Sequence, residues 1–190
     1  MSYIRVEQVG GESFERLSKV LAGIPGGIYR AAYGALQRAG DTAKTRAGQF
    51  AAKEYTISKG VFMKNVAVKS TVSSAGGSGV SMNIRYAGAV LPLVTFNTSY
   101  SRGGRVRVQV KRASAGDVLD HAFAARAFGP MGIFERVGRP RFPVQQLFGP
   151  STAHMMRNEQ VIDQMDETIR ETYKKRMEHE IMRVLNGWGA

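Results

Sequence analysis

The sequence contains no cysteine, and this absence already excludes two kinds of site. Neither a disulfide framework nor a thiolate metal site can form, and nothing indicates an oxidising compartment. The chain also lacks an apolar run of the roughly 20 residues that a membrane-spanning helix needs. Its first residues show no basic segment followed by an apolar one, which an export signal would have. We therefore expect a soluble protein that is made in the cytoplasm and contacts no membrane.

Histidine is scarce, and the three histidines do not indicate a metal site. His121, His154 and His179 have no metal-ligand spacing to one another or to a suitable pair of carboxylates. Asp120 precedes His121 and could orient its imidazole, as in an esterase, but no Gly-x-Ser-x-Gly turn supplies a nucleophile. We expect no catalytic residue, no metal ligand and no cofactor, and hence no enzyme.

A glycine-rich segment at residues 76–79 is a weak candidate for a phosphate-binding loop. It reads Gly-Gly-Ser-Gly but lacks the lysine and the following helix that nucleotide-binding loops use. The residues after it have a strand pattern, so a flexible hairpin tip is the favoured interpretation.

The length and the charge distribution limit the fold and the partners. A chain of 190 residues with 43% hydrophobic content is about the size of one domain with a sizeable core. The formal net charge is +12, and residues 26–112 contain fourteen basic side chains against only Asp41 and Glu54. Such a concentrated excess can steer an anionic partner, which could be DNA or an acidic protein surface.

Apolar residues at helical spacing predict two long helices. The first extends from residue 28 to about residue 54, without proline, and carries the stripe Ile28, Ala32, Ala35, Ala39, Ala43, Ala47 and Phe50. The second extends from about residue 152 to residue 185, with the stripe Val161, Met165, Ile169, Tyr173, Met177, Ile181 and Val184. A shorter pattern at residues 14–22 predicts a short helix or a fragment of one.

Methionines gather on the last predicted helix, at positions 155, 156, 165, 177 and 182. They could form an adaptable binding groove, but filling of the core is the favoured interpretation. His179 lies between two glutamates on this helix, where a solvated position is expected.

Between the two helices the sequence changes to a period of two, which indicates strands. The candidates are residues 66–72, 80–86, 90–96 and 105–111, followed by a hairpin from residues 122–128 and 133–137. In the fourth candidate, Val106, Val108 and Val110 alternate with basic or polar residues. This strand is predicted to have one dry side and one basic side.

The basic side of that strand has two interpretations. Arg105, Arg107 and Lys111, with Arg102 and Arg112 near the ends, could lie along phosphates while Tyr100 stacks on a base. Alternatively, the same face meets acidic groups on another subunit. We favour the protein contact and keep DNA as the alternative.

The segment from Gly132 to Ser151 is predicted to end a sheet, cross a loop and open the last helix. Pro140 and Pro143 keep the chain extended, because proline restricts its own φ and disfavours helix in the preceding residue. Gly149 and Pro150 change the chain direction, which leaves Ser151 or Thr152 to cap the helix that follows.

Three collinear stretches resemble the bacteriophage minor tail protein Z family. The first is Ala39-Gly-Asp-Thr-Ala-Lys-Thr-Arg-Ala47 with Ala52-Lys-Glu-Tyr-Thr-Ile-Ser-Lys59. The second is Leu91-Pro-Leu-Val-Thr-Phe96 with the later Arg-Val-Arg-Val strand. The third is Gly132-Ile-Phe-Glu-Arg-Val-Gly138 with Phe142-Pro-Val-Gln-Gln-Leu-Phe-Gly-Pro-Ser151. The resemblance covers about residues 28–160, and the chain departs from the family at the tip of residues 73–79 and beyond Leu185.

The resemblance implies a tail-completion protein of a long-tailed phage or prophage. Such a protein is a minor, structural part of the virion at the head-proximal end of the tail or at the neck, where it serves head–tail joining. Its implied partners are the terminator, tube and tape-measure proteins, and its implied assembly is a homo-oligomeric ring such as a hexamer. It would be found in the virion, and in the host cytoplasm during assembly. The alternative is a basic nucleic-acid-binding protein of phage or bacterial origin.

For the fold we predict an α+β architecture, with one antiparallel sheet of about four or five strands and two long helices on one face. The chain is expected to be a single domain over residues 1–190, with an N-terminal arm or short helix at 1–27, a core at 28–185 and a tail at 186–190. The side chains expected to make the contacts with partners are Arg102, Arg105, Arg107, Lys111, Arg112, Arg139, Arg141, Phe142, Phe148 and Trp188.

Overall fold

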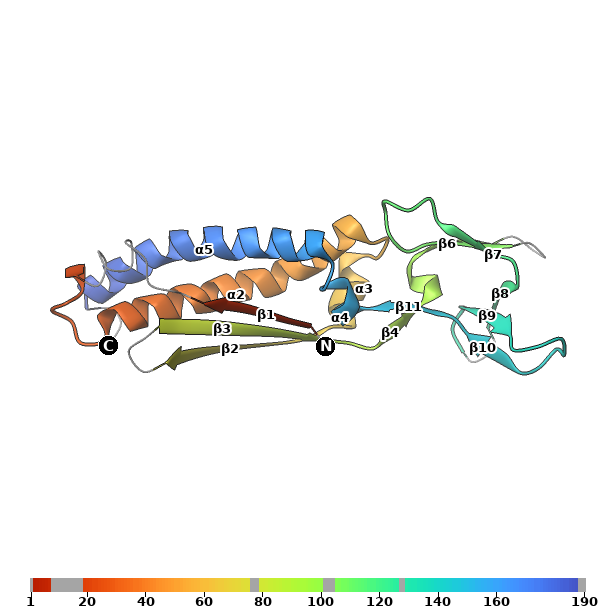
Figure 1. Ribbon diagram of the computed structural model, residues 1–190, viewed down its shortest axis with the longest axis horizontal. Helices are drawn as coiled ribbons and strands as arrows, with labels where there is room; N and C mark the ends of the chain where they lie inside the picture. Colours follow the sequence, from red (N-terminus) through yellow and green to blue (C-terminus); the bar gives the residue numbers. More distant parts are fainter. Residues whose placement is uncertain (1, 8–18, 76–78, 101–104, 127–128, 188–190) are drawn as a thin grey trace. The chain divides into compact units, whose positions relative to one another are not determined.

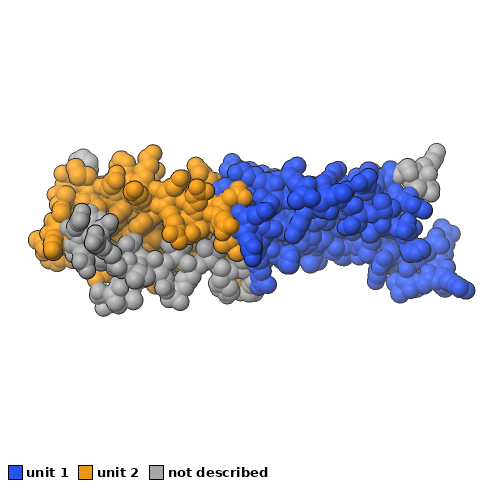
Figure 2. Space-filling view, turned by 45° about the horizontal axis from the view of Figure 1, so that its top comes forward, with its two compact units in different colours: residues 1, 48–67, 87–161 blue, residues 2–47, 68–86, 162–190 orange. Residues whose placement is uncertain are grey.

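The computed structural model describes residues 2–7, 19–75, 79–100, 105–126 and 129–187. The fold is α+β, as predicted, and the described residues include two long helices and several small antiparallel sheets. Backbone contacts divide the chain into two compact units (Figure 2). Unit 1 comprises residues 1, 48–67 and 87–161, and unit 2 comprises residues 2–47, 68–86 and 162–190. The assignment of residues 1–190 to a single domain stays a prediction.

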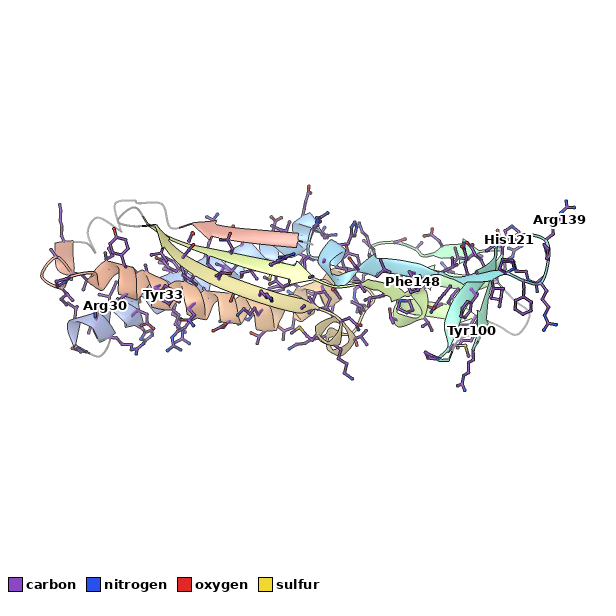
Figure 3. All side chains as sticks on the ribbon, turned by 90° about the horizontal axis from the view of Figure 1, so that it is seen from below. Arg30, Tyr33, Tyr100, His121, Arg139 and Phe148 are labelled. Atoms are coloured by element: carbon purple, nitrogen blue, oxygen red, sulfur yellow. The ribbon has the colours of Figure 1, made fainter. Side chains whose placement is uncertain are left out.

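Unit 2 is a three-stranded sheet covered on one face by the long helices (Figures 1 and 3). Strand β3 (Gly79–Ala87) lies between β1 (Ser2–Glu7) and β2 (Ala67–Ala75), and β1 pairs antiparallel with β3. The helices are α2 (Gly27–Glu54) and α5 (Glu159–Leu185), of which residues 27–47 and 162–185 belong to this unit. Strand β1 lies in the segment that the sequence had suggested to be an arm or short helix. Most of the helix predicted at 14–22 lies outside the described residues.

The face of β3 toward the helices is apolar and buried. Val80, Met82, Ile84 and Tyr86 alternate along the strand and are each at most 2% exposed. Gly40 of α2 touches Met82 so closely that an added Cβ would overlap its sulfur. The small residues of α2 therefore allow the helix backbone to approach the sheet.

The alanine stripe of α2 is buried as predicted. Ala32, Ala35, Ala39, Ala43 and Ala47 are fully covered. The prediction that methionines fill the core is also confirmed, since Met155, Met156, Met165 and Met177 are buried and only Met182, of the five, is exposed.

The last predicted helix is interrupted, so the prediction of one helix from residue 152 to 185 is wrong. A short helix, α4 (Thr152–Met155), is capped by Ser151, whose hydroxyl accepts from the His154 amide at 3.1 Å. The chain then turns, and the side chain of Asn158 accepts from the Gln160 amide at 3.0 Å as α5 begins. Asn158 thus caps the start of α5, just before the apolar stripe that begins at Val161.

Unit 1 is built mainly from short strands in three small sheets among its described residues. Strands β5 (Asn97–Tyr100), β6 (Val106–Gln109) and β7 (Asp117–Leu119) form one antiparallel sheet in that order. Strands β10 (Val144–Gln146), β9 (Gly132–Arg136) and β8 (Ala122–Ala125) form a second, and β11 (Phe148–Ser151) pairs with β4 (Val90–Pro92). Helix α3 (Lys59–Lys64) completes the unit together with α4.

The prediction of one sheet with about four or five strands is therefore wrong. One physical reason is visible at residues 90–96, where a single strand was expected. Strand β4 ends at Pro92, and the chain continues as a 3-10 turn, η1 (Leu93–Thr95). Proline has no amide hydrogen to donate to a ladder. The turn is closed instead by the Thr95 hydroxyl, which donates to the Pro92 carbonyl at 2.7 Å.

The segment from residue 132 to 151 also differs from its prediction. Pro140 and Pro143 lie in the loop of a β9–β10 hairpin, and the chain then forms β11 before α4 begins. The prolines thus shape a hairpin loop, while Gly149 and Pro150 belong to a strand. The predicted hairpin between residues 122–128 and 133–137 is confirmed by the antiparallel pairing of β8 with β9.

Candidate interaction surface

Strand β6 has the predicted dry and basic faces, although it is shorter than expected. Val106 and Val108 are at most 4% exposed, whereas Arg105 and Arg107 are exposed. The valines belong to an apolar cluster with Ala122 and Ile133. Burial of one face therefore orients the arginines toward solvent.

The guanidinium groups of the predicted basic face have partners within unit 1. Arg105 Nε lies 3.1 Å from Asp120 Oδ1, and Arg107 donates to the Ala115 carbonyl at 2.7 Å. Arg112 Nε donates to the Ala52 carbonyl at 2.8 Å. Each guanidinium has five N–H donors, so one such bond leaves capacity for another partner. The face stays cationic but holds its arginines in defined positions.

Lys111 lies just beyond β6, in an isolated bridge with Tyr55. The nearby hydroxyl of Thr56 donates to the Gln109 carbonyl, and the Thr56 amide donates to the Val110 carbonyl at 2.9 Å. These bonds attach the end of the basic strand to the segment that follows α2. Lys111 itself is exposed.

Tyr100 does not share the face of the arginines. It pairs directly with Val106, while Ser99 pairs with Arg107. Directly opposite residues in an antiparallel pair project to the same side of the sheet. Tyr100, which is 48% exposed, therefore lies on the side of the valines. The arrangement in which Tyr100 stacks on a base beside these arginines is therefore not formed by the described residues.

A second group of predicted contact residues forms the β9–β10 tip, which we define as residues 137–143. All seven residues are exposed, with Val137 at 60% and Phe142 at 66%. The Val137 amide donates to the Pro143 carbonyl at 3.1 Å and closes the loop. The Arg141 guanidinium lies 5.8 Å from the centre of the Phe142 ring. The tip thus presents an aromatic ring next to cations.

The remaining predicted contact residues lie elsewhere. Phe148 is 50% exposed on β11 opposite Pro92, in the same two-stranded sheet as the exposed Val90. Figure 3 shows Phe148 well apart from Arg139, which extends from the β9–β10 tip. Arg102 and Trp188 lie outside the described residues. The predicted contact residues of unit 1 therefore lie in at least three separate places.

Some contacts of this surface were not anticipated from the sequence. Asp120, considered only as a partner for His121, pairs instead with Arg105. Arg136 lies over the ring of Phe123 at 6.0 Å, and that ring packs against Phe134 at 6.3 Å. The alternation in β6 and the acidic residues in and after β7 were the signal from which the pairing of Arg105 with Asp120 could have been predicted. The register between β6 and β7 was not known from the sequence.

The described residues contain no group of three or more histidine, cysteine or carboxylate side chains that could hold a metal ion. Within the same residues, no helix is both long enough and apolar enough to cross a membrane. No family model matches the sequence, and neither the curated proteins nor the solved structures contain a match.

Proposed function

We propose that this protein is a structural component of a phage tail, which completes the head-proximal end of the tail or the neck through contacts with other proteins. The resemblance of the three collinear stretches supports this proposal. The observation on the structure that supports it most is the β9–β10 tip, where Phe142 is 66% exposed beside Arg141. Aromatic residues and arginine are the types enriched at protein interfaces. In this role the protein is not an enzyme.

The partners proposed are the terminator, tube or tape-measure protein of the same tail, together with further copies of this chain in a ring. The exposed Phe148 and Val90 offer a second apolar surface for such contacts. The protein would reside in the virion and, before assembly, in the host cytoplasm.

Co-expression with the tail proteins encoded beside the gene tests this proposal. Native mass spectrometry and electron microscopy should detect a ring or a complex with one of these proteins. Phe142→Ala should weaken the complex, because it removes the exposed ring. Val118→Ala is the control, because it removes an exposed apolar group outside the tip and should leave the complex unchanged. A chain that remains strictly monomeric in the presence of every tail protein would contradict the proposal.

Nucleic-acid binding is the second candidate, and it is favoured by the fourteen basic residues between positions 26 and 112. A DNA complex held by phosphate contacts should weaken steeply as salt increases, because counterions are released on binding. Titration of labelled double-stranded DNA at several salt concentrations measures this slope. Weak binding without salt dependence would remove this candidate.

A further inference from the structure

Unit 2 contains a groove between its two helices that the predicted contact residues do not include. We call it the α2–α5 groove, a space of about 420 Å³. The residues that line it include Tyr29, Arg30 and Tyr33 on α2 and Arg183 and Val184 on α5. Figure 3 shows Arg30 and Tyr33 on the same end of α2. The volume lies within the range of about 300–1,000 Å³ of ligand pockets.

The floor of the groove is a buried and paired carboxylate. The Glu180 side chain is 8% exposed and accepts from Arg38 Nε at 3.2 Å and from Arg183 at 2.9 Å. Gly34 makes this position accessible, because an added Cβ would lie 3.0 Å from the Glu180 carboxyl group. The carboxylate therefore has a fixed location between the helices, and its charge is already balanced.

The rim of the groove has an excess of positive charge. Arg183 lines the groove and Arg38 lies beside it, and these two positive charges share the single carboxylate of Glu180. The side chains of Arg38 and Arg183 are 53% and 48% exposed, so both guanidinium groups reach solvent. Because the pair with Glu180 uses only part of the donor capacity of each arginine, both can also donate hydrogen bonds to a further anionic partner.

We propose that the α2–α5 groove binds an acidic segment of a partner protein, with one aromatic or branched apolar side chain inserted between the helices. The apolar side chain would lie against Tyr29, Tyr33 and Val184, and neighbouring carboxylates would pair with the exposed guanidinium groups of the rim. Charge complementarity selects an acidic segment over a basic one. The inference does not depend on a role in a phage tail, because it follows from the groove alone.

A segment of a protein suits this groove better than a small free molecule. Tyr33 is 44% exposed and the arginines reach solvent, so the groove is open along its rim. A small molecule in an open groove keeps much of its surface hydrated, whereas a protein partner covers the rim and excludes water around the inserted side chain.

Fluorescence anisotropy of the full chain with labelled peptides tests the proposal. The probe is a short peptide with a central phenylalanine flanked by aspartates, and two matched peptides carry either alanine at the centre or lysines in place of the aspartates. We expect binding of the first peptide, binding about tenfold weaker for the alanine peptide, which corresponds to about 1.4 kcal/mol, and no binding of the lysine peptide. Equal binding of all three, or of none, would overturn the proposal.

Variants of the chain locate the site. Tyr33→Ala and Arg183→Gln should each weaken binding of the aspartate peptide by about tenfold or more. Met182→Ala is the matched control, because Met182 is 58% exposed on α5 and is not part of the groove lining. Circular dichroism would verify that each variant is folded. Unchanged binding by folded Tyr33→Ala and Arg183→Gln would overturn the assignment to this groove.

A final arm separates a peptide site from a small-molecule site. Unlabelled N-acetyl-phenylalanine supplies a ring and a carboxylate without a chain, and we expect it to compete only at concentrations at least a hundredfold above those of the peptide. Competition at equal concentration would overturn the proposal of a protein partner.

Discussion

Gly149 lies so close to the ring of Phe96 that a Cβ on Gly149 would be 2.6 Å from Cε2 of that ring. Phe96 is 5% exposed, so its ring is held by the surrounding packing. Gly149 belongs to the Leu-Phe-Gly-Pro-Ser sequence at the end of the third stretch of the resemblance. The contact gives that glycine a structural explanation, because any side chain would displace a buried ring.

Gly149→Ala should therefore destabilise unit 1. We expect a loss of about 1–3 kcal/mol in the free energy of unfolding, the usual cost of overpacking, measured by urea titration. Gly60→Ala is the control, because an added Cβ there meets nothing within 4 Å and alanine favours the helix. If both variants unfold at the urea concentration of the native chain, the contact with Phe96 does not require glycine.

A second glycine in unit 1 is constrained by a partly buried hydrogen bond. The Thr152 hydroxyl donates to the Asn65 carbonyl at 3.1 Å, and a Cβ on Gly88 would overlap that hydroxyl and lie 2.6 Å from the carbonyl oxygen. Gly88→Ala should cost about 2–4 kcal/mol, since it adds a clash and breaks the bond. Thr152→Ser keeps the hydroxyl and should cost less than Gly88→Ala. Equal stability of Gly88→Ala and the native chain, by thermal and urea unfolding, would contradict this account.

The ion pairs of α5 should differ in strength according to burial. Glu180 is 8% exposed and holds both Arg38 and Arg183, whereas Asp166 is 47% exposed and pairs with Arg170 at 2.7 Å. We expect Glu180→Gln to cost about 1–2 kcal/mol, because a charged hydrogen bond to a buried group is lost. Asp166→Asn should cost only about 0.3–0.5 kcal/mol, as usual for an exposed i,i+4 pair.

Urea unfolding at low and high salt measures both effects. The Asp166 contribution should disappear at high salt, whereas the Glu180 contribution should largely persist. Equal losses for the two variants at both salt concentrations would show that burial of Glu180 does not strengthen its pairs.

Alkaline pH should destabilise unit 2 through two tyrosines. Burial raises the pKa of Tyr173 to about 12 and shifts the pKa of Tyr86 above its ordinary value, and neither hydroxyl has a hydrogen-bond partner among the described residues. At a pH above about 10, the unfolded state, with a tyrosine pKa of about 10, loses the hydroxyl proton that the folded state still keeps. The contribution of these tyrosines to the free energy of unfolding is complete below about pH 10 and decreases as the pH rises toward 12.

Urea midpoints measured between about pH 8 and pH 11.5 test this dependence. Tyr173→Phe and Tyr86→Phe should each lose less stability over this interval than the native chain. Tyr33→Phe is the control, since Tyr33 is 44% exposed and its replacement should leave the pH dependence unchanged. The interpretation fails if all three variants follow the native curve.

Parts of the fold could be predicted from local patterns. The stripe of Ala32, Ala35 and Ala39 predicted α2, because a buried helix face needs apolar residues at its own period. The alternation of Val106 and Val108 predicted which side of β6 is dry. The interruption at Asn158 was missed, because the predicted helix was extended from the stripe that begins at Val161 back to the expected cap at Ser151 or Thr152. Only the hydrogen bond between the Asn158 side chain and the Gln160 amide marks the new helix start. Strand β1 was missed as well, since its short pattern was assigned to an arm.

The candidate surface could be predicted only in its composition. The sequence identified Arg105 and Arg107 as exposed cations, but the pairing of Arg105 with Asp120 depends on the register of separate strands. The register of β5 against β6 places Tyr100 opposite Val106 and away from the arginines. The α2–α5 groove had no local signal, because its residues lie on two helices from opposite ends of the chain.

By itself, the sequence determined the two long helical regions, the buried faces of individual elements, the concentration of positive charge and the absence of cysteine chemistry. These properties depend on the order of neighbouring residues, which sets the helical or strand period of each segment. The tertiary structure alone decided that the strands form several small sheets, that Phe96 covers Gly149, and that Arg38 meets Glu180 from 142 positions away in the chain. Such contacts depend on how distant segments pack together, and a local period carries no information about the partner across the contact.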